Sequence, residues 1–349
     1  MKISEIFIFS EKIKLISPYK LSFTTIESIR CNIIKIILDT GKVGIGECTA
    51  LPGYGTETFE DIDKIFGEIQ AVLKGLNYDT AKNVVSELHK NYPFAASAIG
   101  TALDFAFTNI ILPKEIKLPL IFPTSTSSDP AYIVQKVQEA YNQGFKTIKV
   151  KIGRNFDEDI ITLEELLKLD LDLNFRLDAN QAYTFEQAQY LINNILAFHS
   201  EKIEYLEQPL PKNDWYNLSK LCQLEKIPIL LDESIYNEQD IKKAAMIGAQ
   251  YVKLKLCKTK GFYDLINIAK MANKLGLKVV LGNGVSTDIS NLIEAIAYHY
   301  NKEIFWGAFE GNGFYKLTKC LLKNPPVVRE GKFVWKNCKE DGVRVQYEN

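Results

Sequence analysis

The chain of 349 residues contains 46% hydrophobic and 24% charged residues, a composition that excludes a disordered or fibrous protein. Its 42 basic and 43 acidic side chains give a formal net charge of -1, which excludes a broad basic surface for nucleic acid. The length fits two domains, or one large barrel with additions, and it allows a core that needs no disulfide or metal for folding.

No targeting or membrane-spanning signal is present in the sequence. The apolar run at the N-terminus is interrupted by Glu5 and closed by Glu11 and Lys12, so it is too short for a secretory signal. No apolar stretch approaches the length of a membrane span. The six cysteines lack any C-x-x-C pair or zinc spacing, which favours reduced and buried thiols. We therefore expect a cytoplasmic protein without a membrane or nucleic-acid partner.

The first 115 residues differ in pattern from the remainder. Strand-like runs come first, with a turn at 39–42 that is typical of a hairpin, and helical patterns follow. The strand-like runs are 3–9, 31–38 and 43–49, and the helical patterns are 58–74, 79–91 and 95–111. Strands followed by helices predict an α+β domain over 1–115.

From residue 116 a repeated unit of one short β run and one amphipathic helix begins. The β runs start every 24 to 28 residues, at 120, 147, 174, 202, 227, 251, 278 and 304. Eight such units predict an α/β fold of the (β/α)8-barrel type over 116–325, because an open sheet rarely needs eight consecutive parallel strands. The segment 326–349 has a Pro-Pro break and a strand pattern, and we expect it to return to the N-terminal domain.

Active sites of such barrels lie at the C-terminal ends of the strands, where this sequence places charged residues. The second β run ends in Lys149-Val150-Lys151, and alternation points both lysines into the barrel. Two ammonium groups this close depress each other's pKa, which favours a neutral amine as base. The alternative is a solvated lysine pair on an exposed strand.

Three successive runs end in carboxylates, namely Asp178, Glu207 and Asp232. A divalent cation would relieve their repulsion, and oxygen ligands without His or Cys favour Mg²⁺ or Mn²⁺. A helix N-cap role would explain one of these acids, but three in a row are harder to explain in that way.

The sixth run carries Lys253 and Lys255 on one face. The second and sixth strands of an eight-stranded barrel lie opposite each other, so a lysine from each would face the metal site from opposite sides. Two opposed bases can remove a proton from one face of a carbon acid and return it to the other face, and the metal would hold the substrate carboxylate and stabilise the enediolate formed between the two steps.

The ordered motifs K-V-K (149–151), L-D-A-N (177–180), E-Q-P (207–209), D-E-S (232–234) and L-K-L-C-K (254–258) resemble the enolase superfamily. The closer similarity is to the muconate lactonizing enzyme subgroup, with its muconate cycloisomerases, dipeptide epimerases, N-succinylamino acid racemases and o-succinylbenzoate synthases. The resemblance implies that 1–115 and the C-terminal segment cap the barrel mouth. It also implies a homo-oligomer that acts on a small-molecule carboxylate.

The resemblance assigns a role to each motif residue. Lys151 and Lys255 would be the acid/base pair, and Lys149 would hold the substrate carboxylate and tune Lys151. The implied metal ligands are Asp178, Glu207 and Asp232, supported by Asn180 and Glu233, of which Glu233 would pair with Lys255. A His-Asp base of the mandelate racemase type is disfavoured, because His89, His199 and His299 fall in helical stretches.

Residues that contact the variable part of the substrate are harder to assign. Candidates in the capping loops are Thr25 in segment 20–28 and Tyr54 in the Gly-rich segment 49–58, which is either a lid or an ordinary surface loop. The turn at Asn283-Gly284 either presents N–H groups to an anion or is a plain strand-to-helix turn. Glu310 and Asn312 keep the spacing of the Asp-x-Asp by which dipeptide epimerases hold the substrate ammonium, but with one charge fewer.

Two reactions fit these residues. The first is racemisation or epimerisation of an amino acid derivative or dipeptide, which uses both lysines as bases. The second is a cycloisomerisation or syn-dehydration, in which one lysine is the base and the other a cation near the intermediate. An aromatic pocket would favour the second reaction, and Phe23, Tyr54 and Phe309 are its candidate walls. A non-catalytic protein would not be expected to keep both lysines and three carboxylates.

Overall fold

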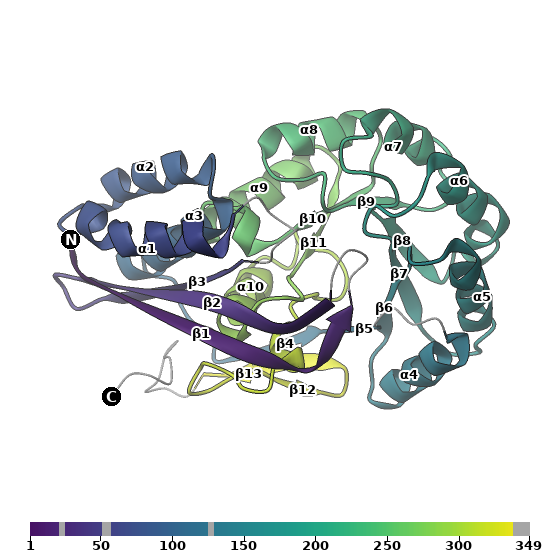
Figure 1. Ribbon diagram of the computed structural model, residues 1–349, viewed down its shortest axis with the longest axis horizontal. Coiled ribbons are helices and arrows are strands. Elements are labelled where there is room, and N and C mark those ends of the chain that lie inside the picture. Colours follow the sequence, from purple (N-terminus) through teal and green to yellow (C-terminus); the bar gives the residue numbers. More distant parts are fainter. Residues whose placement is uncertain (21–24, 51–56, 125–128, 338–349) are drawn as a thin grey trace.

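The computed structural model describes residues 1–20, 25–50, 57–124 and 129–337 (Figure 1). The N-terminal domain is an antiparallel sheet in the order β1-β2-β3, covered by three helices. Its elements are β1 (Ile3–Lys20), β2 (Thr25–Leu38), β3 (Val43–Thr49), α1 (Phe59–Leu73), α2 (Tyr78–His89) and α3 (Pro93–Phe107). The predicted hairpin turn is confirmed, with Gly41 at a φ of 80°. The first strand, in contrast, is much longer than its predicted range of 3–9.

Alternation along β2 gives the capping sheet two buried faces. Ile34 and Ile36 belong to the apolar core under the helices, whereas Cys31 and Ile33 belong to the core that continues into the barrel. All four side chains are fully buried. Since successive strand residues face opposite sides, this one strand joins the helical layer to the barrel.

Close packing between β3 and α3 requires a glycine at position 46. A Cβ added there would collide with the backbone carbonyl of Ala98, which cannot move without displacing the helix. We expect Gly46→Ala to lower the free energy of unfolding by about 2–4 kcal/mol, measured by chemical denaturation. Gly67→Ala is the matched control, because a Cβ at this position in α1 meets nothing and should stabilise the helix by about 0.5–1 kcal/mol. Equal stability of the two variants would contradict this packing.

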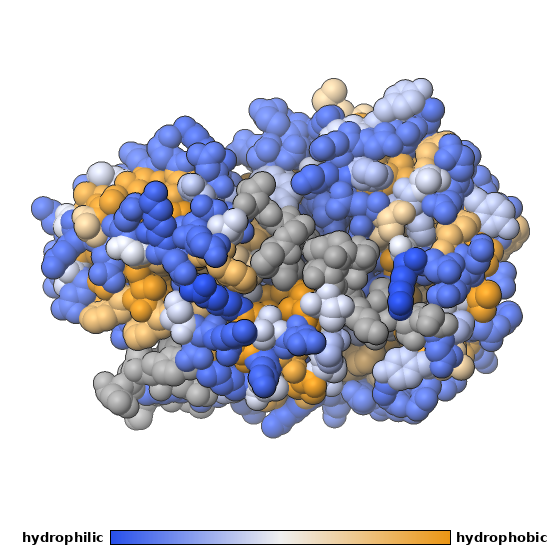
Figure 2. All heavy atoms as spheres, in the orientation of Figure 1, coloured by the Kyte–Doolittle hydropathy of each residue, from blue (hydrophilic) through white to orange (hydrophobic). Residues whose placement is uncertain are grey.

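The second domain is a curled parallel sheet with helices on its outer side (Figure 1). The strand order is β5-β6-β7-β8-β9-β10-β11, each pairing with the next. The strands are β5 (Ile121–Pro123), β6 (Thr147–Lys151), β7 (Asn174–Asp178), β8 (Ile203–Glu207), β9 (Ile229–Leu231), β10 (Tyr251–Leu254) and β11 (Lys278–Leu281). The helices are α4 (Pro130–Asn142), α5 (Phe156–Leu167), α6 (Phe185–Asn194), α7 (Trp215–Cys222), α8 (Glu238–Met246), α9 (Phe262–Lys274) and α10 (Asp288–Tyr300), with short η1 (Leu196–His199) and η2 (Leu256–Lys258). On the face shown in Figure 2, the outer helices present mostly hydrophilic side chains.

The predicted eighth strand at 304–309 is not continuous. Phe305 bridges Val279 of β11, and Phe309 bridges Leu120 beside β5, so two isolated bridges close the barrel. Gly307 lies between them with a φ of 72°, a left-handed conformation that interrupts an extended strand. The α/β barrel prediction is therefore confirmed, with an irregular final unit.

The C-terminal segment pairs with the chain just before the barrel. The strands β12 (Val327–Arg329), β13 (Lys332–Lys336) and β4 (Glu115–Pro119) form a sheet in the order β12-β13-β4. The Phe333 ring packs edge-to-face on Phe309 and Phe314, the latter in η3 (Phe314–Lys316). The described part of 326–349 thus joins the domain junction rather than the β1-β2-β3 sheet, because β4 offers it an open edge.

A membrane-spanning helix would need a long apolar stretch. No helix in the described ranges has the length and hydrophobicity to cross a bilayer.

Candidate active site

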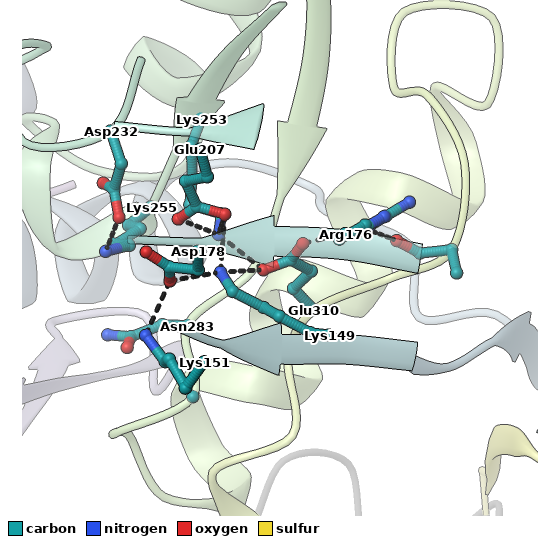
Figure 3. Close-up of polar contacts among 12 residues, drawn as sticks. Lys149, Lys151, Arg176, Asp178, Glu207, Asp232, Lys253, Lys255, Asn283 and Glu310 are labelled. Carbon is teal, nitrogen blue, oxygen red and sulfur yellow. Dashed lines mark hydrogen bonds and ion pairs between the residues drawn. The ribbon is translucent and has the colours of Figure 1, made fainter. Parts of the chain in front are cut away.

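A cavity lies at the C-terminal ends of the barrel strands, beneath the capping domain. The capping domain contributes Thr49 and Phe94 to its wall. The predicted lysines Lys149, Lys151 and Lys255 line it, as do Asp178, Asp232 and Asn180. Among the predicted residues alone, Lys149 and Lys255 lie 106 positions apart in the sequence and yet face one space (Figure 3).

Lys151 is held at the cavity by the neighbouring strand. The β6–β7 register places it beside Asp178, and its Nζ donates to Asp178 Oδ2 at 2.6 Å (Figure 3). The same Nζ donates to Asn180 Oδ1 at 2.7 Å. Val150 between the lysines is buried in the apolar core, as alternation requires. The amine of Lys151 thus has a fixed position at the cavity wall.

Lys149 is surrounded by carboxylates. Its Nζ lies 2.6 Å from Glu207 Oε2, 2.9 Å from Asp178 Oδ2 and 3.1 Å from Glu310 Oε2. Burial by itself would lower the pKa of Lys149, but these three carboxylates together raise it well above its ordinary value. The expectation that like charge lowers the pKa within the lysine pair is therefore wrong for Lys149, which stays an ammonium ion.

The three predicted metal-binding carboxylates lie at the ends of adjacent strands, with Asp178 the last residue of β7, Glu207 the last of β8 and Asp232 directly after β9, and each is at most 2% exposed. Burial, and then repulsion by Asp178, raise the pKa of Glu207 to about 7. Burial opposes ionisation of Asp178 and Asp232 as well. Lysine neighbours nevertheless hold the pKa of Asp178 and of Asp232 below its ordinary range.

Lys255 lines the same cavity as Lys151 but from the opposite side of the barrel. It follows β10, four strands from β6, and its Nζ donates to Asp232 Oδ2 at 2.7 Å (Figure 3). Lys258, one turn later in η2, donates to Asp232 Oδ1 at 2.9 Å and to the Asp232 carbonyl at 2.7 Å. The sequence analysis assigned no role to Lys258, although its spacing from Lys255 in a short helical turn indicates a shared face.

The donor set suits a hard divalent cation. Asp178, Glu207 and Asp232 offer only carboxylate oxygens, the ligands that Mg²⁺ prefers. Lysines contact all three in this structure, and within the described ranges no group of three His, Cys, Asp or Glu is arranged to hold a metal ion. A cation would therefore take the place beside these carboxylates that ammonium groups hold here.

Asn180 and Glu233, which were expected to support the metal ligands, pair with each other. Asn180 Nδ2 donates to Glu233 Oε1 at 3.0 Å, and Asn180 Oδ1 accepts from Lys151. Glu233 therefore supports the Lys151 side of the cavity, and its predicted pairing with Lys255 is wrong, since Lys255 pairs with Asp232. The side chain of Asn180 can make these bonds because its backbone turns sharply, with a φ of 43°.

Gln208 is a positioning residue that the sequence analysis missed. Its Oε1 accepts from the backbone N–H of Asp232 at 3.1 Å and of Ser234 at 3.2 Å, and its Nε2 donates to Ser234 Oγ and the Leu210 carbonyl. This buried amide ties the segment after β8 to the segment after β9. It thereby fixes Glu207 relative to Asp232.

Glu310 lines the cavity and also lies at the centre of a buried polar network. Its Oε1 accepts from Arg176 at 2.8 Å, and its Oε2 lies 2.5 Å from Lys253 Nζ (Figure 3). Oε1 also accepts from the Tyr205 hydroxyl at 2.6 Å. Burial opposes its ionisation, but Lys149, Lys253 and Arg176 lower its pKa well below its ordinary value. Alternation two residues before Asp178 and Glu207 could have indicated that Arg176 and Tyr205 point inward, as it did for Lys253 before Lys255.

The other residues predicted to contact the substrate do not all lie at the cavity. Asn283, Gly284 and Asn312 line the cavity, whereas Thr25 is exposed at the start of β2 and does not line it. Phe309 is buried against Phe333 and is not a cavity wall. Tyr54 and Phe23 lie outside the described residues. The histidines lie in α2, η1 and α10, as expected, and none lines the cavity.

Glu294 of α10 holds the backbone next to Lys255. Its Oε1 accepts from the Leu256 N–H at 3.0 Å, and burial raises its pKa to about 7. Because the folded pKa exceeds the ordinary value, its stabilising contribution is complete below about pH 4.5 and is lost as pH rises through about 7.

We therefore expect Glu294→Gln to be more stable than the parent at about pH 8, by on the order of 1–3 kcal/mol, with the difference shrinking toward about pH 5. Urea unfolding at both pH values measures this difference. A difference between parent and variant that does not depend on pH would contradict it. The exposed Glu303→Gln is the control.

Family models cover most of the chain. Residues 3–121 match the mandelate racemase/muconate lactonizing enzyme N-terminal domain, and residues 132–339 match the enolase C-terminal domain-like family.

Individual relatives align over nearly the whole chain. An L-amino acid-D/L-Glu epimerase of Sulfurimonas denitrificans is 28% identical and aligns over 90% of this chain and 95% of its own. An N-succinyl-L-Arg/Lys racemase of Bacillus cereus is 21% identical over 91% of this chain and 89% of its own. A dipeptide epimerase of Enterococcus faecalis, solved with Mg and L-Leu-L-Tyr, superposes with a TM-score of 0.85 at 23% identity, covering 98% of this chain and 99% of the other.

Proposed function

Because the chain belongs to the mandelate racemase/muconate lactonizing enzyme group of the enolase superfamily, we propose that it is an isomerase that inverts the α-carbon of a small carboxylate. The single observation that carries this proposal is the placement of Lys151 and Lys255 on β6 and after β10, strands on opposite sides of the barrel, in one cavity. A carbon acid bound between them would present one face to each amine.

The roles of the two lysines follow from their contacts. Lys151 is held by Asp178 and Asn180, and Lys255 by Asp232, so each Nζ has a fixed position at the cavity wall. One amine would accept the α-proton, and the opposite ammonium would deliver a proton to the other face of the enediolate. Lys149 keeps its charge and would offset the negative charge of the substrate carboxylate, rather than act as a base.

Asp178, Glu207 and Asp232 would hold the divalent cation. Bound there, Mg²⁺ or Mn²⁺ would lower the energy of the negative charge that develops when the α-proton leaves. The relative solved with Mg supports this cofactor for the present chain.

The substrate is an amino acid derivative or a dipeptide. Support comes from the relatives, which are named epimerases of dipeptides and a racemase of N-succinylamino acids. The cavity suits such a molecule, because apolar Ile121, Pro123 and Val285 lie in the same wall as the polar groups.

Deuterium exchange tests the reaction. The protein is incubated in D₂O with Mg²⁺ and a library of dipeptides and N-acylamino acids, followed by mass spectrometry and chiral chromatography. We expect deuterium at a single α-carbon together with inversion at that carbon. No exchange with any library member would contradict the proposal and would favour cycloisomerisation or dehydration.

Removal of divalent cations is expected to abolish exchange without unfolding the protein. Lysines already offset the three carboxylates, so the fold does not depend on the cation. Dialysis against a chelator should lower the exchange rate at least about 10²-fold, and added Mg²⁺ should restore it. Circular dichroism checks the fold. Full activity after chelation would contradict a metal-dependent reaction.

A further inference from the structure

One end of the cavity carries polar groups that the proposed proton transfer does not use. Asn312 and Lys316 line this end next to Gly284. A Cβ built at Gly284 would lie 2.9 Å from Asn312 Oδ1 and 3.0 Å from Lys316 Nζ, so both polar atoms approach the same glycine. Lys316 also donates to the Gly284 carbonyl at 2.8 Å. An acceptor and a cationic donor therefore lie side by side at the cavity wall.

The Asn312 acceptor has an unmet hydrogen-bonding capacity. The side chain is only 2% exposed, and its Oδ1 has no hydrogen-bond partner among the described residues. A buried acceptor without a partner costs stability, and a ligand N–H is one way to satisfy it. The position at the cavity wall makes the substrate the natural donor.

Lys316 is placed by contacts from both domains. It ends η3, where the Phe314 N–H donates to Asn291 Oδ1 of α10 at 3.1 Å. The next residue, Leu317, bridges Leu15 of β1, and the Thr318 N–H donates to the Lys14 carbonyl at 3.0 Å. The base of this side chain is thus fixed where the capping sheet meets the barrel.

Charge at this end disfavours a substrate ammonium. The carboxylates that line the cavity, Asp178, Asp232 and Glu310, are each paired with lysine or arginine. A free ammonium beside Asn312 would meet a neutral amide and the cation of Lys316. An amide N–H with a nearby carbonyl or carboxylate would instead match the acceptor and the donor in turn.

We propose that Asn312 and Lys316 form a specificity subsite for the acylated nitrogen and its acyl group, selecting substrates with a neutral or anionic acyl group over dipeptides, whose acyl group carries a free ammonium. Asn312 Oδ1 accepts the amide N–H, and Lys316 Nζ donates to the acyl oxygen or to a carboxylate at the end of the acyl group. This subsite rests on the proposed α-carbon inversion and names the substrate class for it.

Three matched probes test the subsite, namely glycyl, N-acetyl and N-succinyl derivatives of the same amino acid, each made with leucine, lysine and glutamate. The three carry a positive, a neutral and a negative group at the acyl end. We expect kcat/KM for exchange to rise from glycyl to N-acetyl to N-succinyl, by at least about tenfold overall.

Substitutions in the subsite, compared with a control substitution outside it, show whether a change in probe preference comes from the subsite. Lys316→Met should lower kcat/KM for the N-succinyl probe by about tenfold and change the N-acetyl probe by less than about threefold. Lys316→Glu and Asn312→Asp should shift the preference toward the glycyl probe. Lys319→Met is the control, since this lysine is half-exposed on the same segment, pairs with Glu11 and does not line the cavity.

The outcomes distinguish the two claims. Exchange of all probes with an unchanged order in the Lys316 variants would overturn the subsite and leave the inversion reaction standing. If the parent protein exchanges none of the probes, the inversion reaction itself is contradicted. In that case the subsite can be tested by binding alone. Calorimetry measures how tightly each probe binds, with Mg²⁺ present, to a double variant that carries Lys151→Ala and Lys255→Ala. Equal affinity for the glycyl and N-succinyl probes would overturn the subsite.

Discussion

Alanine at Lys151 or at Lys255 is expected to abolish inversion of the α-carbon and to leave the fold intact. Each lysine would be the only base on its side of the substrate, so we expect kcat/KM for inversion to fall at least about 10³-fold. The fold should survive, because Asp178 keeps Lys149 and Asp232 keeps Lys258 as partners. Chiral chromatography measures the inversion, and circular dichroism checks the fold.

Lys319→Ala is the control for the loss of a lysine charge. Inversion at near the parent rate in either active-site variant would exclude a reaction with two lysine bases. Loss of inversion in both variants with an unchanged control is the result that the proposed roles require.

Glu310→Gln is expected to destabilise the protein by about 3–5 kcal/mol, although position 310 lies at the cavity. The carboxylate offsets Lys149, Lys253 and Arg176, and the side chains of Arg176 and Lys253 are at most 2% exposed. A glutamine of similar shape leaves these buried cations with one negative charge fewer, because only Asp178, Glu204 and Glu207 remain to pair with them. Chemical denaturation measures the effect.

The control for this substitution is Glu303→Gln, which lies on the surface and should change stability by less than about 0.5 kcal/mol. A Glu310→Gln variant as stable as the parent but with altered substrate preference would instead favour the sequence-based role of Glu310 as a substrate contact.

The grouping of lysines and carboxylates around one cavity was predictable from the sequence because strands impose simple geometry. Alternation gives the inward direction of Lys149 and Lys151, and the repeat of 24 to 28 residues gives the order of strands. Register then brings Lys151 beside Asp178. These relations depend on local pattern and on barrel closure, both of which are visible in the chain.

The contacts of Glu310 and Lys316 were not predictable in the same way. The final barrel unit is interrupted at Gly307, so strand alternation does not fix where Glu310 points. Lys316 depends on a short helical turn that is anchored to α10 and, through the bridge from Leu317 to Leu15, to β1 at the other end of the chain. Such packing between distant segments leaves no periodic signal. The extent of β1 was missed because the charged residues Glu11, Lys12 and Lys14 interrupt its apolar run, although Ile13 among them is buried in the core.

The most direct test of the opposed lysines is enantiomer-resolved deuterium exchange by the two single variants. Each pure enantiomer of an exchanged substrate is incubated in D₂O with Mg²⁺ and either Lys151→Ala or Lys255→Ala. The opposed arrangement predicts that each variant exchanges only the enantiomer whose α-proton faces the remaining lysine, without inversion, and that the two variants choose opposite enantiomers. Exchange of the same enantiomer by both variants would contradict it.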